Sequence, residues 1–277
     1  MIKNLDPNKI ADKKFGQNFL KDETILNKII EAMPKDGLKI VEIGPGLGDL
    51  TRQLIKVGQV KAYEVDNRLC NYLLNEFKEP IKSGKLELVC KDVLEQNGTL
   101  DNEPYALVAN LPYYIATNII LNALRDSNCK RVLAMVQKEV ALKFSASVKD
   151  RNFGSLAILS QSVADVRLLF EVPPTAFAPP PKVTSAVLYI EKRDSLKDRD
   201  FEEFLKVATK QPRKTLLKNL SALYDKELLK SIFKKLNIKE AARAHEISLS
   251  DYHQLYELLK DRKDESRRAK KDRAKSK

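Results

Sequence analysis

Residues 38–51 read LKIVEIGPGLGDLT, and this stretch decides the fold. Its apolar first half predicts a buried strand that ends at Gly44, and Gly46 and Gly48 follow at two-residue intervals. The next residues, DLTRQLIKV (49–57), have the spacing of an amphipathic helix. A strand joined to a helix by a glycine-rich turn lets the backbone approach a ligand closely. Taken alone, the stretch also fits a purely structural turn.

Six further apolar stretches of strand length follow the first. The seven predicted strands are LKIVEIG (38–44), KAYEV (61–65), LELVC (86–90), YALVANL (105–111), RVLAMVQ (131–137), VRLLFEV (166–172) and SAVLYIE (185–191). Helical patterns separate the first five, so right-handed crossovers predict an α/β fold with a mostly parallel sheet. The last two are joined by a proline-rich loop over 171–184, which predicts a closing hairpin and an antiparallel strand at the sheet edge.

Strand patterns end near residue 192, and helical patterns with short polar breaks replace them. These patterns are FEEFLKVATK (201–210), KELLKSIFKKL (226–236) and DYHQLYELL (251–259). We therefore place an α/β domain over 1–192 and a small all-helical domain over 193–260. The remaining residues, 261–277, lack apolar periodicity and are expected to form a disordered basic tail.

The charge of the chain points to a polyanionic partner. The net charge is +12, and from Lys260 to Lys277 ten Lys/Arg outnumber four Asp/Glu, which gives 10 − 4 = +6. Half of the excess charge therefore lies in the last 18 residues, 260–277. A basic arm suggests nucleic acid as a partner, although such a tail can also serve solubility alone.

The apolar runs, the cysteines and the histidines of the sequence bear on the cellular compartment and on metal binding. Its apolar runs are far shorter than the roughly 20 residues of a membrane span, and its charged N-terminus resembles no secretory signal. Cys70, Cys90 and Cys129 are odd in number and widely spaced, so we expect a reducing compartment, the cytoplasm, and no disulfide. His245 and His253 lie in no metal-ligand cluster, so we expect no metal.

The glycine spacing disfavours a dinucleotide. The G-x-G-x-x-G fingerprint would place its third glycine at position 49, which is an aspartate in this chain. Since a carboxylate at a helix N-terminus repels a pyrophosphate, a cofactor without phosphate suits the turn better.

Two acidic residues at strand ends sharpen this interpretation. Glu64 ends the second strand, where an acid accepts hydrogen bonds from ribose hydroxyls, and Asp92 follows the third, where it can accept from an adenine amino group. Alternatives remain open: Glu64 could pair with Lys61, Asp66 could take the ribose, and Asp92 could be a helix N-cap. With the glycine turn, these carboxylates outline a nucleoside pocket that fits S-adenosylmethionine.

The fourth predicted strand ends in Asn110-Leu111-Pro112-Tyr113. The Asn110 amide carbonyl and the Leu111 backbone carbonyl provide two acceptors, Pro112 fixes the turn, and Tyr113 offers a stacking face. Such a group suits an exocyclic amine on a planar base that is flipped out or unpaired. Two hydrogen bonds from adenine N6 would make that nitrogen more tetrahedral and more nucleophilic. A strand ending in a structural proline turn is the alternative.

Together these motifs resemble the KsgA-type family of small-subunit ribosomal RNA adenine dimethyltransferases. The resemblance covers about residues 12–260 and is carried, in order, by FGQNFL (15–20), VEIGPGLG (41–48), NLPY (110–113), QKEVA (137–141), EVPPTAF and APPPKVTSAV (171–187), and RAHEIS (243–248). It implies a Rossmann-like class I methyltransferase fold, S-adenosylmethionine as methyl donor and no metal. The implied cofactor-binding residues are Asn18, Leu20, Gly44, Gly46, Glu64, Asp92 and Asn110, and the implied catalytic residues are Asn110, Leu111, Pro112 and Tyr113.

Further contacts with RNA are expected outside the cofactor pocket. The resemblance implies that Phe177 stacks on the target base together with Tyr113, although Phe177 could equally fill the core beneath its loop. In KQPRKTLLKN (210–219), four basic residues are candidates for phosphate contacts: Lys210, Arg213, Lys214 and Lys218. Pro212 and His245 depart from the family pattern.

By resemblance, the substrate is a pair of adjacent adenosines in the 3′-terminal hairpin loop of 16S rRNA. Each would become N6,N6-dimethyladenosine within an immature small subunit, and we expect the enzyme to be a monomer. Rival readings are an erythromycin-resistance methyltransferase acting on 23S rRNA, an assembly factor that has kept the fold without catalysis, and a small-molecule methyltransferase. Leu111 and the RAHEIS stretch favour the small-subunit reading over the first rival.

Overall fold

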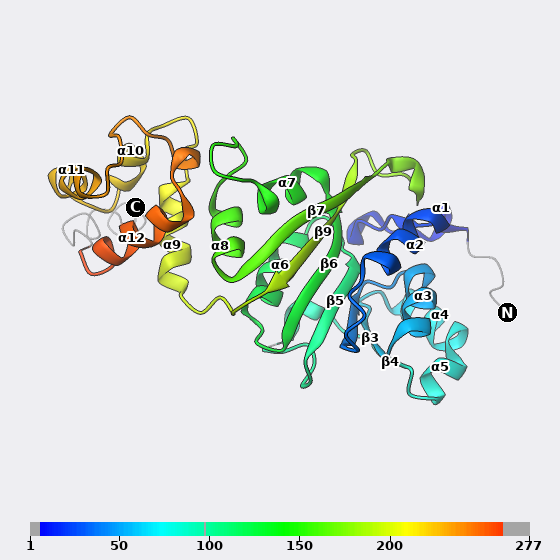
Figure 1. Cartoon of the computed structure of the whole chain (residues 1–277). Helices are drawn as coiled ribbons and strands as arrows, with labels where there is room; N and C mark the ends of the chain where they lie inside the picture. The colour runs from blue at the N-terminus through cyan, green and yellow to red at the C-terminus, as the bar shows by residue number, and fades with distance from the viewer. Residues whose placement is uncertain (1–5, 97, 263–277) are drawn as a thin grey trace, which may run out of the picture. The chain divides into compact units, whose positions relative to one another are not determined.

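The computed structural model describes residues 6–96 and 98–262, and these form two compact units (Figure 1). The described parts of the first unit lie within 1–142 and 163–195, and those of the second within 143–162 and 196–277. The longer segment of the second unit begins at residue 196, whereas the sequence analysis placed the boundary after residue 192. The second unit also takes in residues 143–162, which include the end of α7 (Lys138–Ser145) and most of α8 (Ser155–Val163) and which the sequence analysis left in the first domain.

The first unit is built on a seven-stranded sheet in the order β4-β3-β2-β5-β6-β9-β7. Its strands are β2 (Lys39–Ile43), β3 (Val60–Tyr63), β4 (Leu86–Val89), β5 (Tyr105–Asn110), β6 (Cys129–Gln137), β7 (Ala164–Val172) and β9 (Ser185–Lys192). Each corresponds to a strand predicted from sequence. Neighbours from β4 to β6 are parallel, whereas β9 is antiparallel to both β6 and β7. The predicted fold class is therefore confirmed.

The antiparallel strand lies inside the sheet and not at its edge. β9 is hydrogen-bonded to β6 on one side and to β7 on the other, so the edge strand is β7. After β6 the chain passes through two helices, α7 and α8, before it forms β7. β7 does not pair with β6 but lies two positions away from it in the sheet, which leaves a gap between them. The hairpin predicted over 171–184 then returns the chain into the gap as β9.

Helices cover the sheet and form the second unit. In chain order they are α1 (Pro7–Ile10), α2 (Glu23–Ala32), α3 (Asp49–Val57), α4 (Asn67–Glu76), α5 (Lys78–Lys82), α6 (Ala116–Arg125), α7 (Lys138–Ser145), α8 (Ser155–Val163), α9 (Arg199–Ala208), α10 (Leu216–Leu220), α11 (Lys226–Lys235) and α12 (Leu249–Leu259). Aspartates fix several helix starts: the carboxylate of Asp22 accepts hydrogen bonds from the backbone N–H groups of Thr24 and Ile25 at α2. Asp66, Asp198 and Asp225 do the same at α4, α9 and α11.

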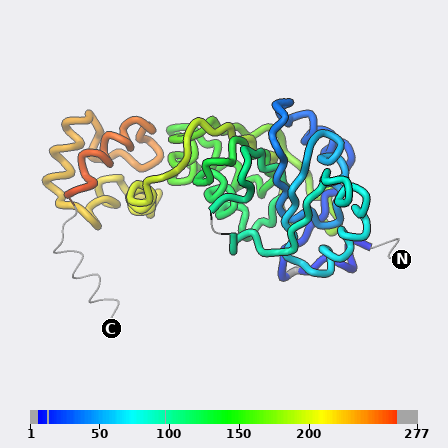
Figure 2. The backbone as a smooth tube through the Cα atoms, turned by 90° about the horizontal axis from the view of Figure 1, so that it is seen from below, coloured from blue at the N-terminus to red at the C-terminus, as the bar shows by residue number. Residues whose placement is uncertain are grey.

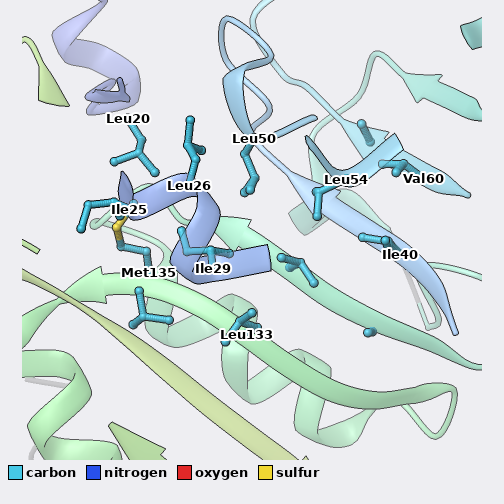
Figure 3. Close-up of a cluster of buried hydrophobic side chains, with 14 of the residues drawn as sticks. Leu20, Ile25, Leu26, Ile29, Ile40, Leu50, Leu54, Val60, Leu133 and Met135 are labelled. Atoms are coloured by element: carbon cyan, nitrogen blue, oxygen red, sulfur yellow. The ribbon is translucent and has the colours of Figure 1, made fainter. Parts of the chain in front are cut away.

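The main core lies between one face of the sheet and α2 and α3 (Figure 3). Ile25 and Ile29 on α2 recur at helical spacing and point toward β6, where Leu133 and Met135 are buried. Figure 1 shows α6 on the opposite face of the sheet. Because both faces are covered, the central strands are mostly apolar, as in YALVA (105–109) of β5. This packing fixes the strand ends that carry the polar residues of the site.

The described part of the second unit after residue 195 is a small helical cluster, drawn from yellow to red in Figure 2. Aromatic rings from α9 and α12 form its centre: Phe201 lies 5.0 Å from Tyr256, centroid to centroid, and Phe204 lies 5.6 Å from the same ring. The Asn219 amide of α10 donates a 2.7 Å hydrogen bond to the backbone carbonyl of Ala208. No helix among the described residues has the length and apolar character needed to cross a bilayer.

The prediction that no cysteines are paired was wrong. Cys70 on α4 and Cys90 at the end of β4 form a disulfide, with 6.0 Å between their Cα atoms. The chain leaves α4 and returns through β4, which brings two cysteines 20 residues apart side by side. Cys129, at the start of β6, is buried and unpaired. Spacing alone does not show which residues such a return brings into contact.

Candidate active site

A pocket opens where β2, β3 and β5 end, at the carboxyl edge of the sheet. The chain from Phe15 to Leu20, which precedes α2, forms another wall of the same pocket. All of the cofactor-binding and catalytic residues predicted from sequence line it: Asn18, Leu20, Gly44, Gly46, Glu64, Asp92, Asn110, Leu111, Pro112 and Tyr113. Residues separated by more than 90 positions are thus brought into one cavity.

The floor of the pocket is the glycine turn. Gly44 and Gly46 have φ values of 68° and 61°, in the left-handed region that side chains other than glycine rarely adopt. A Cβ on Gly46 would lie only 2.9 Å from the ring of Phe19, so there is no room for a side chain between the turn and the N-terminal segment. Gly44 is partly exposed and lines the pocket, so its backbone can lie directly against a bound ligand.

Glu64 follows β3 and is 4% exposed. Its carboxylate accepts hydrogen bonds from the backbone N–H of Gly46 at 3.2 Å and of Asp66 at 2.9 Å. Burial raises the pKa of Glu64, and these N–H donors oppose the rise. Lys61 was the alternative partner considered for Glu64. Its ammonium nitrogen instead lies 3.4 Å from a carboxylate oxygen of Glu87.

Asp66 is engaged elsewhere and does not compete for the ligand. It accepts two hydrogen bonds from the Arg68 guanidinium, at 3.1 and 2.7 Å, and one from the Gln17 amide at 3.0 Å. The Arg68 bonds hold the pKa of Asp66 down at about 2. Gln17 thereby ties the N-terminal segment to the start of α4, beside Glu64.

Asp92 caps a short helix and also lines the pocket. One oxygen accepts a 2.8 Å hydrogen bond from the backbone N–H of Leu94 and so caps the short 3₁₀ helix Val93–Glu95. The residue also lines the pocket, and a carboxylate has a second oxygen with its own lone pairs. An N-cap role therefore leaves an acceptor for an adenine amino group.

Asn110, the last residue of β5, has a fixed orientation. Its amide nitrogen donates a 3.1 Å hydrogen bond to the backbone carbonyl of Asn18. The Asn18 amide donates in turn to the carbonyl of Gly16 at 3.0 Å. Because one hydrogen of the Asn110 amide is used in this way, the side-chain oxygen stays available to accept a hydrogen bond from a ligand.

The residues after Asn110 are held by β6 and β9. The Leu111 backbone N–H donates to the carbonyl of Met135 at 3.0 Å, which fixes the peptide next to the amide. The Tyr113 hydroxyl lies 2.6 Å from the Ser185 hydroxyl, and burial raises the pKa of Tyr113. A neutral ring fixed at its far end is suited to stacking.

Phe177 lies apart from these residues. It belongs to the short strand β8 (Phe177–Ala178), which pairs antiparallel with β1 (Phe19–Leu20). Its side chain is 5% exposed, lies in the main hydrophobic core and does not line the pocket. Stacking of Phe177 on a target base stays a prediction, and its placement favours the core role.

The four candidate phosphate-binding residues lie in the second unit. Lys210, Arg213, Lys214 and Lys218 are all exposed, around the loop that leads into α10. That loop is well anchored: Thr215 caps α10 by accepting from the N–H of Lys218, and it forms a β-bridge with Arg243. Its basic side chains thus project from a fixed backbone.

Sequence reasoning missed three residues that shape the pocket: Gln17, Glu42 and Ser185. Gln17 and Ser185 act on residues 49 and 72 positions away, which no local pattern reveals. Glu42 was recognisable as an acid inside an apolar strand. It is buried in β2, and one of its oxygens accepts a 2.7 Å hydrogen bond from the Thr51 hydroxyl.

Glu42 makes the stability of the first unit depend on pH. Burial, with Glu64 and Asp49 nearby, raises the pKa of Glu42 from 4.5 to about 8. Between these values the folded protein keeps a proton that the unfolded chain has lost, so stability falls as pH rises through this window. Glu42→Gln should remove that dependence. Relative to the wild type, its free energy of unfolding should be higher at pH 8 than at pH 5 by at least about 1.4 kcal/mol, the equivalent of one pKa unit. Urea denaturation measures this, and exposed Glu103→Gln is the control.

The pocket fits S-adenosylmethionine. It offers carboxylates for a ribose and an adenine, a glycine backbone with no space for side chains, and acids that complement a sulfonium and an ammonium group. Within residues 6–96 and 98–262, no group of three or more His, Cys, Asp or Glu residues is arranged to hold a metal. The donor set is therefore that of an organic, cationic, nucleoside-containing cofactor.

Sequence comparisons identify the relatives of this chain. The family model described as "Ribosomal RNA adenine dimethylase" matches residues 8–261. Ribosomal RNA small subunit methyltransferase A of Sulfurimonas denitrificans is 56% identical over 252 residues, covering 91% of this chain and 94% of that protein. The protein of the same name in Aliarcobacter butzleri is 50% identical over 256 residues, covering 91% and 97%.

Solved structures agree on the fold. A dimethyladenosine transferase from Plasmodium falciparum gives a TM-score of 0.74 at 24% identity, covering 88% of this chain and 96% of that chain. The 23S rRNA methyltransferase ErmE gives 0.67, also at 24% identity, covering 88% and 100%. Likeness at this level of identity concerns the fold, whereas the family match extends over nearly the whole chain. The chain belongs to the ribosomal RNA adenine dimethylase family.

Proposed function

We propose that this protein transfers methyl groups from S-adenosylmethionine to N6 of adenosines in small-subunit ribosomal RNA. The observation that carries the proposal is the fixed amide of Asn110. Its nitrogen donates to the Asn18 carbonyl at 3.1 Å, which leaves the side-chain oxygen available as an acceptor, and Asn110 lines the pocket together with Leu111. Relatives at 50% identity and above are named ribosomal RNA small subunit methyltransferase A, which supports the same substrate class.

In this proposal the residues of the chain prepare a weak nucleophile. Bound S-adenosylmethionine supplies an electrophilic methyl group on a positively charged sulfur. The Asn110 side-chain oxygen and the Leu111 carbonyl accept the two hydrogens of the target amine, which favours a tetrahedral nitrogen with a directed lone pair. Tyr113, tethered to Ser185, holds the base by stacking. Positioning of this kind can lower a barrier substantially without a strong general base.

Within this RNA, the proposed substrate is a pair of adjacent adenosines in the 3′-terminal hairpin loop of 16S rRNA. Each of them is converted to N6,N6-dimethyladenosine. An unpaired loop lets a base reach a pocket of this kind without the cost of opening a duplex. Recognition of an immature small subunit, action as a monomer and a cytoplasmic location complete the proposal. The exposed basic residues of the second unit support a ribosomal partner.

Those basic residues predict a salt-dependent contribution to binding. Replacing Lys210, Arg213, Lys214 and Lys218 together by alanine should reduce the slope of log affinity against log salt by roughly 3, since each phosphate contact contributes about 0.7–0.9. The KM for the subunit should rise while kcat at saturation changes little. Binding of labelled small subunits across a salt series measures the slope.

A matched variant tests whether position, and not total charge, matters. Lys56, Lys78, Lys82 and Lys85 are exposed lysines of the first unit, and their joint replacement by alanine removes the same charge. An equal loss of slope in both variants would show that the loop before α10 has no special role in binding.

The direct test of the function uses small subunits from cells that lack this activity. The subunits are incubated with the protein and labelled S-adenosylmethionine, and modified nucleosides are mapped by nuclease digestion and mass spectrometry. We expect N6,N6-dimethyladenosine at the paired adenosines of the 3′-terminal loop. Label confined to large-subunit RNA would support the 23S rRNA alternative instead. Tight subunit binding without any label would contradict catalysis and leave an assembly factor.

A further inference from the structure

Tyr114 is the most exposed large hydrophobic residue of the pocket. Its side chain is 60% exposed, and it directly follows the four residues assigned to catalysis. Two other exposed apolar residues line the same pocket, Val65 at 41% and Leu94 at 39%. Exposed apolar side chains are unremarkable when scattered, but three around one cavity mark a surface that a ligand covers.

Two of these three residues are close in the chain to the two carboxylates assigned to adenosine. Val65 follows Glu64 in the chain, and the backbone of Leu94 is hydrogen-bonded to Asp92. Adenine has polar edges and two apolar faces, so an adenosine site needs both acceptors and flat apolar cover. Val65 and Leu94 come from the ends of β3 and β4, on one side of the glycine turn that ends β2.

Tyr114 comes from the other side of that turn, because β5 is the neighbour of β2 away from β3. A Cβ placed on Gly16 would lie 3.5 Å from the Tyr114 ring, so the ring lies close to the N-terminal segment. Tyr114 lines the same pocket as Glu64 and Asp92, and burial raises the pKa of Tyr114, with the charges of these two acids adding to the rise. The ring therefore lies beside the N-terminal segment, in the pocket that holds the adenosine-binding acids.

We propose that Tyr114 is a cofactor-positioning residue that closes the adenosine part of the site, with its ring covering the face of the nucleoside that Val65 and Leu94 leave open. This inference rests on the proposed use of S-adenosylmethionine and adds a residue to it. Tyr113 and Tyr114 then have separate partners, the target base for the first and the cofactor for the second. Their adjacency in sequence places the two ligands next to each other.

Calorimetric titration with S-adenosylhomocysteine, without RNA, tests the proposal on the full chain. Tyr114→Ala should raise the Kd about tenfold, in the range of losing one aromatic stacking partner, whereas Tyr114→Phe should stay within twofold. Adenosine alone should be weakened by the same factor, because the ring acts on that part of the molecule. Leu74→Ala removes an exposed apolar side chain of α4 that does not line the pocket, and it should change nothing.

A fluorescence measurement gives an independent readout. The chain contains no tryptophan, so Tyr114→Trp introduces a single indole at this position. Its emission should change on addition of S-adenosylhomocysteine and saturate with the Kd found by calorimetry, whereas Leu74→Trp should not respond. An unchanged Kd in Tyr114→Ala, with a raised KM for the ribosomal substrate, would assign the ring to RNA and overturn the proposal. Failure of the wild-type protein to bind the cofactor product would instead contradict the proposed function itself.

Discussion

Replacing Asn110 by alanine is expected to lower the turnover of methyl transfer by a factor of about 100–1,000, the range seen when one preorganised hydrogen-bonding group at a reacting centre is removed. The variant loses the acceptor that we assign to the N6–H of the target adenine. Binding of the ribosomal substrate should change little, because phosphate contacts elsewhere supply most of the affinity. Single-turnover methylation with saturating substrate measures the effect on kcat without interference from product release.

Asn110 also holds the N-terminal segment, so a second variant is needed. Its nitrogen donates to the Asn18 carbonyl, and loss of that bond alone could loosen the pocket. Asn110→Asp keeps a side-chain oxygen and removes the donor. If the acceptor carries the effect, Asn110→Asp should retain more turnover than Asn110→Ala, although its charge prevents full activity. Asn75→Ala, an exposed asparagine of α4 bonded only to the Asn71 carbonyl among the described residues, is the control. Full turnover in Asn110→Ala would rule out the two-acceptor model.

The sheet could be predicted from sequence because its pattern is local. Alternating strands and helices, with a glycine turn after the first strand, leave few topologies open. The position of β9 between β6 and β7 could not be derived in this way. It depends on how far the crossover after β6 travels, and that distance is set by the packing of helices that the strand pattern does not describe.

The site residues that lie at the ends of predicted strands could be predicted from the sequence. Those that depend on contacts between residues far apart in the sequence could not. Glu64, Asp92 and Asn110 each follow a recognisable strand, so parallel topology alone brings them to one edge. The contact of Gln17 with Asp66, which removed a rival for the ribose, joins residues 49 positions apart. The Cys70–Cys90 pair was missed for the same reason. A pairing set by a chain return has no signal in composition or periodicity.

Replacing Glu64 by alanine is expected to raise the Kd for the cofactor by a factor on the order of 100. A carboxylate that accepts from two ribose hydroxyls makes charge-assisted hydrogen bonds, each contributing about 1.5–3 kcal/mol. Loss of both would exceed a hundredfold, but water that enters the vacated space restores part of the hydrogen bonding. Calorimetric titration with S-adenosylhomocysteine measures this Kd without involving RNA. Glu87→Ala on β4, an exposed strand glutamate paired with Lys61, is the matched control.

The same substitution also separates cofactor binding from folding. Glu64 accepts from the N–H groups of Gly46 and Asp66, so Glu64→Ala leaves two donors of the pocket without their partner. Some loss of stability is therefore expected, and a thermal melt should accompany each titration. Turnover at saturating cofactor should recover toward wild type, because Glu64 contacts no reacting atom in this scheme, whereas Asn110→Ala should not recover at any cofactor concentration. If a Glu64→Ala variant folds and binds the cofactor as tightly as the wild type, Glu64 does not bind the ribose. The adenosine would then need a different place in the pocket.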